Sequence, residues 1–139
     1  MSEREILFRG QTRRKGEKVR ISGEPVDSNW VYGGIFPGEG DFSIIYQAKP
    51  KIEKFTVYSD TVGQFTGLTD KNGKKIFEGD IVKTSHGGST YYAKIEWDDG
   101  SFWVTNHDIQ MPSYISEVSK TYLEVIGNIY DNPELLKGE

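Results

Sequence analysis

TVGQFTGLTDKNGKKIFEGDIVK, residues 61 to 83, is the stretch around which the rest of the chain is interpreted. Its centre, Asn72-Gly73, lies between apolar residues on both sides. Asn-Gly is the strongest short hairpin signal, because both central positions of a type I′ turn need φ > 0. The stretch therefore predicts a type I′ hairpin with a polar, solvated tip.

A second reversal is predicted a few residues later, at Gly79-Asp80. Gly79 permits a sharp change of direction, and the Asp80 carboxylate is placed to accept backbone N–H bonds at the start of the next strand. Asn72, Gly73, Gly79 and Asp80 are thus predicted to be structural turn residues. The β-branched pair Ile81-Val82 then begins a strand.

Downstream, short alternating segments predict a small antiparallel sheet. Tyr91 to Trp97 alternates cleanly, which directs Tyr91, Ala93, Ile95 and Trp97 to one face. The predicted strands are 81–84, 91–97, 102–105 and 123–130, with a hairpin turn at 98–100. Tight connections between them suggest an SH3-like barrel, an analogy of fold that implies no function. Asn132-Pro133-Glu134 predicts a short C-terminal helical turn.

Upstream, five short segments predict further strands, at 5–9, 19–21, 30–35, 42–47 and 54–59. Gly33-Gly34 within the third of them indicates a bulge or a close backbone approach. The fold class predicted is mainly β: an N-terminal antiparallel lobe over residues 1–59 and an SH3-like lobe over 60–139. One continuous domain over 3–136 is the alternative.

Several segments carry a resemblance to a known family. TVGQFTGLTDKNGKKIFEGDIV is similar to the signature of the YopX family, small proteins of phages and prophages of low-GC bacteria. REILFRG at the start, WVYGGI at 30–35 and EVIGNIYDNPELL near the end also resemble it. The family has no established activity, so the resemblance implies no catalytic residue.

Composition indicates the cellular compartment in which the protein works. The chain has no cysteine, no apolar run long enough to span a membrane and no signal-peptide core at its start, which predicts a cytoplasmic protein of a bacterial host. Residues 1–20 hold seven basic and three acidic side chains, whereas the remainder holds ten and eighteen. An acidic body argues against wrapping duplex DNA, because neutralising phosphates needs a basic face.

An enzyme is not expected. The sequence contains neither a nucleophile motif nor a Gly-rich phosphate loop followed by Lys-Ser/Thr. The conceivable metal ligands match no known spacing: His86, Asp98, Asp99, His107 and Asp108. We expect no catalytic residue, no metal and no cofactor.

Two groups of residues are candidates for binding. Tyr92 and Trp103 alternate away from the predicted core and are the candidate contacts with a protein partner, against the plainer interpretation that they cover the rim of the barrel. A basic cluster is the candidate contact with nucleic acid: Arg13, Arg14, Lys15, Lys18 and Arg20. Its plainer interpretation is a solvated hairpin loop that protects an edge strand.

The sequence favours a non-enzymatic phage or prophage accessory protein that binds a phage or host protein, or itself as a homo-oligomer. The alternative is a protein that binds single-stranded nucleic acid through exposed rings and the basic N-terminal arm.

Overall fold

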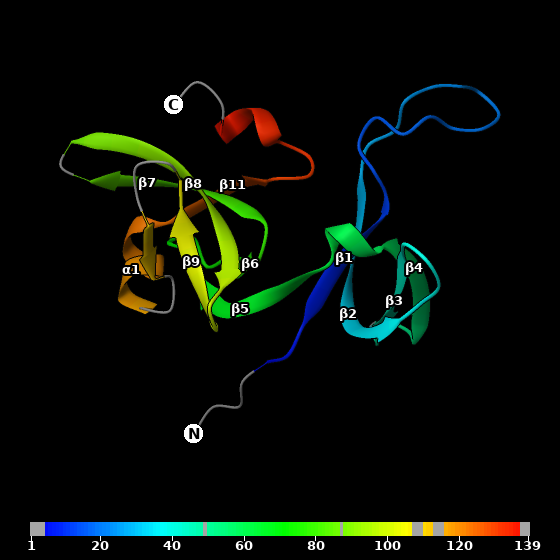
Figure 1. Ribbon diagram of the computed structural model, residues 1–139, viewed down its shortest axis with the longest axis horizontal. Helices are drawn as coiled ribbons and strands as arrows, with labels where there is room; N and C mark the ends of the chain where they lie inside the picture. The colour runs from blue at the N-terminus through cyan, green and yellow to red at the C-terminus, as the bar shows by residue number, and fades with distance from the viewer. Residues whose placement is uncertain (1–4, 49, 87, 107–109, 113–115, 137–139) are drawn as a thin grey trace. The chain divides into compact units, whose positions relative to one another are not determined.

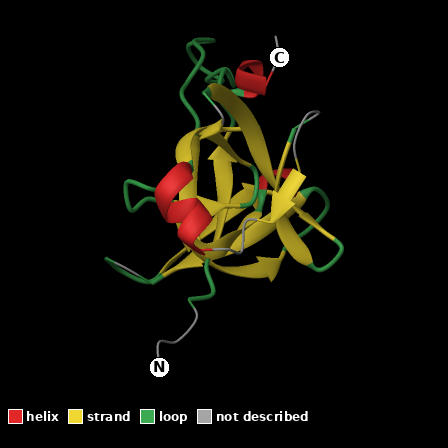
Figure 2. Ribbon diagram, turned by 90° about the vertical axis from the view of Figure 1, so that its left-hand side faces the viewer, coloured by secondary structure: helices red, strands yellow, loops and turns green. Residues whose placement is uncertain are grey.

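The computed structural model describes residues 5–48, 50–86, 88–106, 110–112 and 116–136 (Figure 1). The chain forms two compact units, Met1–Gln64 and Phe65–Glu139. Both are built from antiparallel strands, and the few helical segments are short (Figure 2). The predicted mainly β class is therefore confirmed. No helix within the described ranges is both long and apolar enough to cross a membrane.

The first unit is a curled antiparallel sheet with strand order β4-β3-β2-β1. Its elements are β1 (Phe8–Arg13), β2 (Asn29–Pro37), β3 (Phe42–Gln47), β4 (Glu53–Tyr58) and the 3₁₀ turn η1 (Ser59–Thr61). Val31, Ile45 and Val57 form its buried core. β1 also lies against β4, where a Cβ at Gly10 would be 2.8 Å from a Val57 methyl, so the sheet wraps closely around this core.

Two predicted strands of this unit differ from the structure. The strand at 19–21 is absent: residues 14–28 leave the sheet as an excursion with one isolated bridge, Lys18 to Pro25. Ile21 there is 97% exposed, because its alternation has no sheet to face. The strand predicted at 5–9 begins at Phe8 instead, which leaves Ile6 71% exposed.

β5 (Gly63–Thr69) leads from the first unit to the second. Its first residues, Gly63 and Gln64, pair with β1, and its later residues pair with β6 (Lys75–Phe77). The turn between β5 and β6 is tight as predicted, but its type was wrong. Gly73 has φ +82° whereas Asn72 keeps a negative φ, which gives a three-residue loop with glycine in the left-handed position.

The second unit contains a five-stranded sheet of order β10-β9-β8-β7-β11. Its elements are β7 (Asp80–His86), β8 (Ser89–Asp98), β9 (Ser101–Thr105), β10 (Gln110–Pro112), α1 (Ser116–Tyr122), β11 (Glu124–Asn128) and η2 (Pro133–Leu136). The predicted strands β7, β8, β9 and β11 and the C-terminal helical turn are confirmed. The SH3-like barrel stays a prediction.

Gly79 makes the sharp turn that was predicted for it, whereas the Phe77 N–H that Asp80 accepts belongs to the preceding strand β6 and not to the start of the next strand. Gly79 has φ +91°, and its backbone is held on both sides: its N–H donates to the Ile95 carbonyl and its carbonyl accepts from the Ile129 N–H, both at 2.8 Å. The buried Asp80 carboxylate accepts the Phe77 N–H at 2.7 Å. These bonds fix the reversal between β6 and β7.

Candidate binding surface

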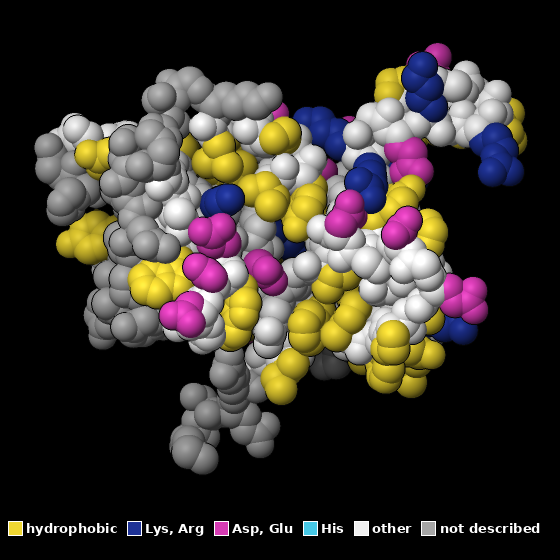
Figure 3. Space-filling view, viewed as in Figure 1, with side chains coloured by type: hydrophobic (Ala, Val, Ile, Leu, Met, Phe, Trp, Pro, Cys, Tyr) yellow, Lys and Arg dark blue, Asp and Glu magenta, His cyan; other side chains and the backbone are white. Residues whose placement is uncertain are grey.

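The first unit exposes four aromatic side chains from β2 and β3, which we call the aromatic face. Tyr32, Phe36, Phe42 and Tyr46 are each between 41% and 52% exposed. Hydrophobic side chains gather over β2, β3 and β4 in the space-filling view (Figure 3). Exposed rings in such number are unusual for a small unit, and rings of this kind often anchor contacts between proteins.

Strand register explains why these rings share one face. Ile35 pairs with Ile45 on the core side of the sheet, so their neighbours project to the opposite side. There Gly34 pairs with Tyr46 and Phe36 with Ile44. Residues directly opposite each other in an antiparallel pair point to the same face, which brings the rings together.

Two rings of the aromatic face contact each other, and a third contacts a ring of β4. Phe36 and Tyr46 meet edge to face with ring centroids 4.9 Å apart, and Phe42 lies 5.4 Å from the Tyr58 ring of β4. The Phe36 ring extends toward Gly34, where a Cβ would be 3.9 Å from it. Paired rings hold each other in place, so less side-chain entropy would be lost when a partner covers them.

A close backbone contact fixes the strands beneath the rings. A Cβ at Gly33 would be 1.8 Å from the Tyr46 carbonyl oxygen, so this position has no room for a side chain. The close approach predicted at Gly33-Gly34 is therefore confirmed. The sequence signal for the aromatic face was present in this same segment, since Tyr32 and Phe36 alternate with the buried Val31 and the half-buried Ile35.

The aromatic face carries little charge. Among the described residues of β2, β3 and β4 that alternate onto it, Lys54 is the one charged side chain, paired across the strands with Tyr46. A face with one cation offers no basic track for a phosphate backbone. Its composition fits contact with another apolar protein surface.

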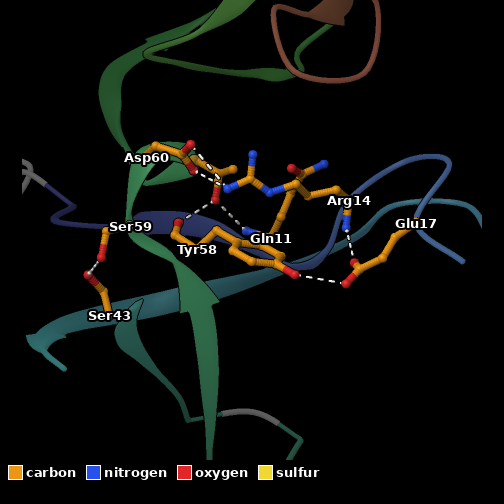
Figure 4. Close-up of polar contacts among 8 residues, drawn as sticks. Gln11, Arg14, Glu17, Ser43, Tyr58, Ser59 and Asp60 are labelled. Carbon is orange, nitrogen blue, oxygen red and sulfur yellow. Dashed lines mark hydrogen bonds and ion pairs between the residues drawn. The ribbon is translucent and has the colours of Figure 1, made fainter. Parts of the chain in front are cut away.

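Beside this face, a set of polar contacts joins the excursion to the end of β4, and we call it the clamp (Figure 4). The Arg14 guanidinium donates to both carboxylate oxygens of Asp60, at 2.9 and 3.1 Å, and lies 4.1 Å from the centre of the Tyr58 ring. Glu17 accepts the Arg14 backbone N–H at 2.9 Å and the Tyr58 hydroxyl at 2.8 Å. The clamp fixes the base of the excursion.

The clamp shifts the pKa values of two of its members. The hydrogen bond from the Arg14 backbone N–H, followed by that from the Tyr58 hydroxyl, lowers the pKa of Glu17. The hydrogen bond that Tyr58 donates to Glu17 raises the pKa of the Tyr58 phenol. Both shifts favour the state in which Glu17 is ionised and Tyr58 is protonated.

Two members of the predicted basic cluster, Arg13 and Arg14, have side chains that contact groups of the first unit. Arg14 is engaged by Asp60, and the Arg13 side chain donates to the Asp27 carbonyl at 2.9 Å. Lys15, Lys18 and Arg20 are exposed residues of the excursion. These basic side chains are therefore spread along a loop, and the Arg14 guanidinium lies next to the Asp60 carboxylate.

Tyr92 and Trp103, the predicted protein contacts, are half-buried in the second unit. The Trp103 indole N–H donates to the Asp98 carbonyl at 3.0 Å, and the Tyr92 carbonyl accepts from the Asn106 amide at 2.8 Å. Trp97, which was predicted to share a face with Tyr91, Ala93 and Ile95, is 52% exposed. It lies opposite the buried Phe102 of β9, near the Asp99-Gly100 turn, and the two rings are 4.8 Å apart.

The hairpin turn predicted at residues 98–100 is confirmed, with φ +50° at Asp99 and +80° at Gly100. Within the ranges that the structure describes, no group of three or more His, Asp or Glu side chains is placed to hold a metal. The side chain of His86 and all of His107 and Asp108 lie outside those ranges.

Comparison with known proteins gives the family. The profile described as YopX protein matches residues 38–137, which is most of the chain. This chain belongs to the YopX family. The match covers β3, β4 and η1 of the first unit and nearly all of the second unit.

Among solved structures, the fold is similar to the crystal structure of protein EF1440 from Enterococcus faecalis. The TM-score is 0.55 at 23% sequence identity, over 97% of this chain and 100% of that one. At this identity the likeness concerns the fold alone. No curated protein matches the sequence.

Proposed function

We propose that this YopX-family chain is a non-enzymatic phage or prophage protein that works in the bacterial host cytoplasm by binding protein. The partner that binds the aromatic face is a second copy of the same chain. The observation that supports this most directly is the set of four exposed rings on β2 and β3, two of which, Phe36 and Tyr46, contact each other. Family membership supports the phage or prophage origin.

A second copy suits this face because the face carries little charge and can pair with itself around a two-fold axis. Contacts between identical chains most often use one patch twice around a two-fold axis, so the patch has to complement itself. Within β2, β3 and β4, Lys54 is the one charged side chain that alternates onto this face, so these strands bring few like charges together when the face meets its own copy. Rings and backbone then supply most of the contact.

The test is the mass of the protein in solution. We expect light scattering after size exclusion at micromolar concentration to give a mass above the 15.8 kDa of one chain. The double variant Phe36→Ala/Tyr46→Ala should return to the monomer mass with its strand content retained, because both rings are exposed. The control is Tyr122→Ala, which removes a 54% exposed ring outside the aromatic face and should leave the mass unchanged.

A monomer mass for the parent across concentrations would contradict self-association. A parent oligomer that persists in the double variant would show that another surface holds it. Trp103→Ala and Tyr92→Ala should not shift the mass, since both side chains are half-buried.

The competing occupant is single-stranded nucleic acid, because bases stack on exposed rings in a sequence-tolerant way. The ion pair between Arg14 and Asp60 removes one cation from the set that would bind phosphates. We therefore expect no gel shift of short single-stranded DNA or RNA at physiological salt. Tight binding by the parent, lost when Arg13, Arg14 and Lys15 are changed to Ala, would favour nucleic acid instead.

A further inference from the structure

The excursion of residues 14–28 carries exposed apolar side chains at its far end, residues 18–24, which we call the tip. Ile21 of the tip is 97% exposed and Val19 is 40% exposed. The excursion extends away from the sheet of the first unit (Figure 1), and hydrophobic and basic side chains lie on it (Figure 3). Covering two aliphatic side chains with another surface would be favourable, because it removes apolar area from water.

Backbone hydrogen bonds give the tip a defined shape. The Val19 N–H donates to the Glu24 carbonyl at 2.9 Å. The Gly23 N–H donates to the Val19 carbonyl at 2.7 Å and closes a turn that has Ile21 at its centre. The aliphatic side chains are therefore presented by a hydrogen-bonded turn, so less backbone entropy is lost when a partner covers them.

The base of the excursion adjoins the aromatic face through Tyr58. The Tyr58 ring lies 5.4 Å from the Phe42 ring of the aromatic face. The Tyr58 hydroxyl donates to Glu17 at 2.8 Å, and the Arg14 guanidinium lies 4.1 Å from the centre of the same ring (Figure 4). A protein that lies on the aromatic face is therefore beside the base of the excursion as well.

The chemistry of the tip complements that of the aromatic face. Lys18 and Arg20 flank Val19 and are exposed, and cations of this kind are attracted to the faces of aromatic rings. Glu24 on the same tip supplies a carboxylate for Lys54, the charged side chain that alternates onto the aromatic face from β4. One chain thus presents both an apolar tip with two cations and a ring-lined face that suits it.

We propose that the tip of the excursion packs on the aromatic face of a second copy, with Ile21 and Val19 against its rings. This inference rests on the self-association proposed above and names the segment of the second copy that the face receives. Two-fold symmetry makes the contact reciprocal, because each copy contributes one tip and one face. A change at the tip is therefore felt twice in the assembled pair.

A dilution series of tip variants tests the contact. Ile21→Ser should weaken self-association about a hundredfold, as measured by light scattering, because each of the two copies loses one buried aliphatic side chain. The matched control is Ile6→Ser, the same change at a side chain that is 71% exposed and lies outside the tip and the aromatic face. It should leave the mass unchanged at every concentration. Both sites are exposed, so circular dichroism should show the strand content of the parent.

Crosslinking locates the tip on the second copy. The chain has no cysteine, so Ile21→Cys introduces a single thiol that can carry a benzophenone crosslinker. This labelled chain is mixed with an equal amount of ¹⁵N-labelled parent that carries no crosslinker. After irradiation, we expect attachment to ¹⁵N peptides from residues 30–46, the range that contains all four rings. The same crosslinker on Ile6→Cys should not attach there.

The possible results separate this inference from the self-association on which it rests. An Ile21→Ser oligomer with the affinity of the parent would overturn the inference and leave self-association standing. Crosslinks confined to the labelled chain itself, or to ¹⁵N peptides outside residues 30–46, would do the same. A parent that is monomeric at every concentration would overturn both proposals.

Discussion

The two units of this chain use their apolar residues in different ways. In the second unit, seven buried residues form one cluster: Ile76, Val82, Ala93, Ile95, Phe102, Val104 and Leu123. In the first unit the buried cluster has three members, Val31, Ile45 and Val57, and four large rings remain exposed on the aromatic face. The second unit therefore buries the larger apolar cluster, whereas the first leaves four rings exposed on one face of its sheet.

The two units also differ in whether their polar contacts are buried or exposed. In the second unit a buried carboxylate, that of Asp70, accepts the Asn72 and Lys74 N–H groups at 2.9 Å and the Val125 N–H at 2.8 Å. It joins the β5–β6 hairpin to β11. In the first unit the clamp is made of exposed groups. A buried polar joint should matter far more for stability than an exposed one.

The largest effect should come from Asp70→Ala. The change leaves three backbone N–H groups without their acceptor next to a buried core, which should lower the free energy of unfolding by about 4 kcal/mol. Urea denaturation measures it. Asp98→Ala removes an exposed carboxylate of the same unit and should cost less than about 0.5 kcal/mol. Similar losses in the two variants would mean that the Asp70 bonds are not what joins β11 to the hairpin.

The next effect compares the two faces of one sheet in the first unit. Ile45→Ala removes a side chain with 0% exposure and should cost about 3 kcal/mol. Phe36→Ala, on the opposite face and 52% exposed, should cost less than about 1 kcal/mol despite the larger deletion. Thermal unfolding of the two variants at one low concentration measures both. A greater loss for Phe36→Ala would show that the aromatic face belongs to the folded core.

A smaller effect separates two glycines that share a left-handed backbone. A Cβ at Gly73, where φ is +82°, would point into open space, so Gly73→Val should cost about 1–2 kcal/mol from backbone strain alone. Gly79 at φ +91° adds a collision with Tyr130, and Gly79→Val should cost about 1 kcal/mol more. Thermal unfolding of both variants measures the difference. An unchanged melting midpoint for Gly73→Val would contradict the turn geometry.

These features differ in how far the sequence predicts them. The turns at Gly73 and Gly79 could be predicted because neighbouring residues determine a turn. The β5–β6 turn type was wrong because Asp70 holds the Asn72 and Lys74 N–H groups, and its third bond reaches Val125, fifty-five residues away. No pattern within a short stretch of the sequence predicts the bond between Asp70 and Val125.

The same limit applies to the candidate sites. Alternation along 91–97 correctly predicted that Ala93 and Ile95 are buried, yet it could not show that Trp97 on the same face is 52% exposed. Alternation along 30–36 likewise predicts two faces of the strand, but it does not show that one of them remains exposed to solvent.

The smallest effect expected is a pH dependence of the clamp. The pKa of Glu17 is lowered in the folded chain, so its contribution is present above its ordinary value of 4.5 and is lost as the pH falls through the lowered folded value. The pKa of Tyr58 is raised, so its contribution is present below its ordinary value of 10.0 and is lost as the pH rises through the raised one. The clamp should therefore be intact throughout the neutral range.

Amide signals of residues 14–28, followed by nuclear magnetic resonance, report this opening. Glu17→Gln should remove the acid transition, because an amide does not titrate. Tyr58→Phe is the sharper variant: it keeps the ring beneath Arg14 but removes the hydroxyl. Since the Arg14 backbone N–H is the largest cause of the lowered Glu17 pKa, this variant should keep most of the acid shift and lose the alkaline transition. If Tyr58→Phe instead returned the Glu17 pKa to its ordinary value, the phenol would be the group that holds the excursion to β4, and the Arg14 backbone bond would be secondary.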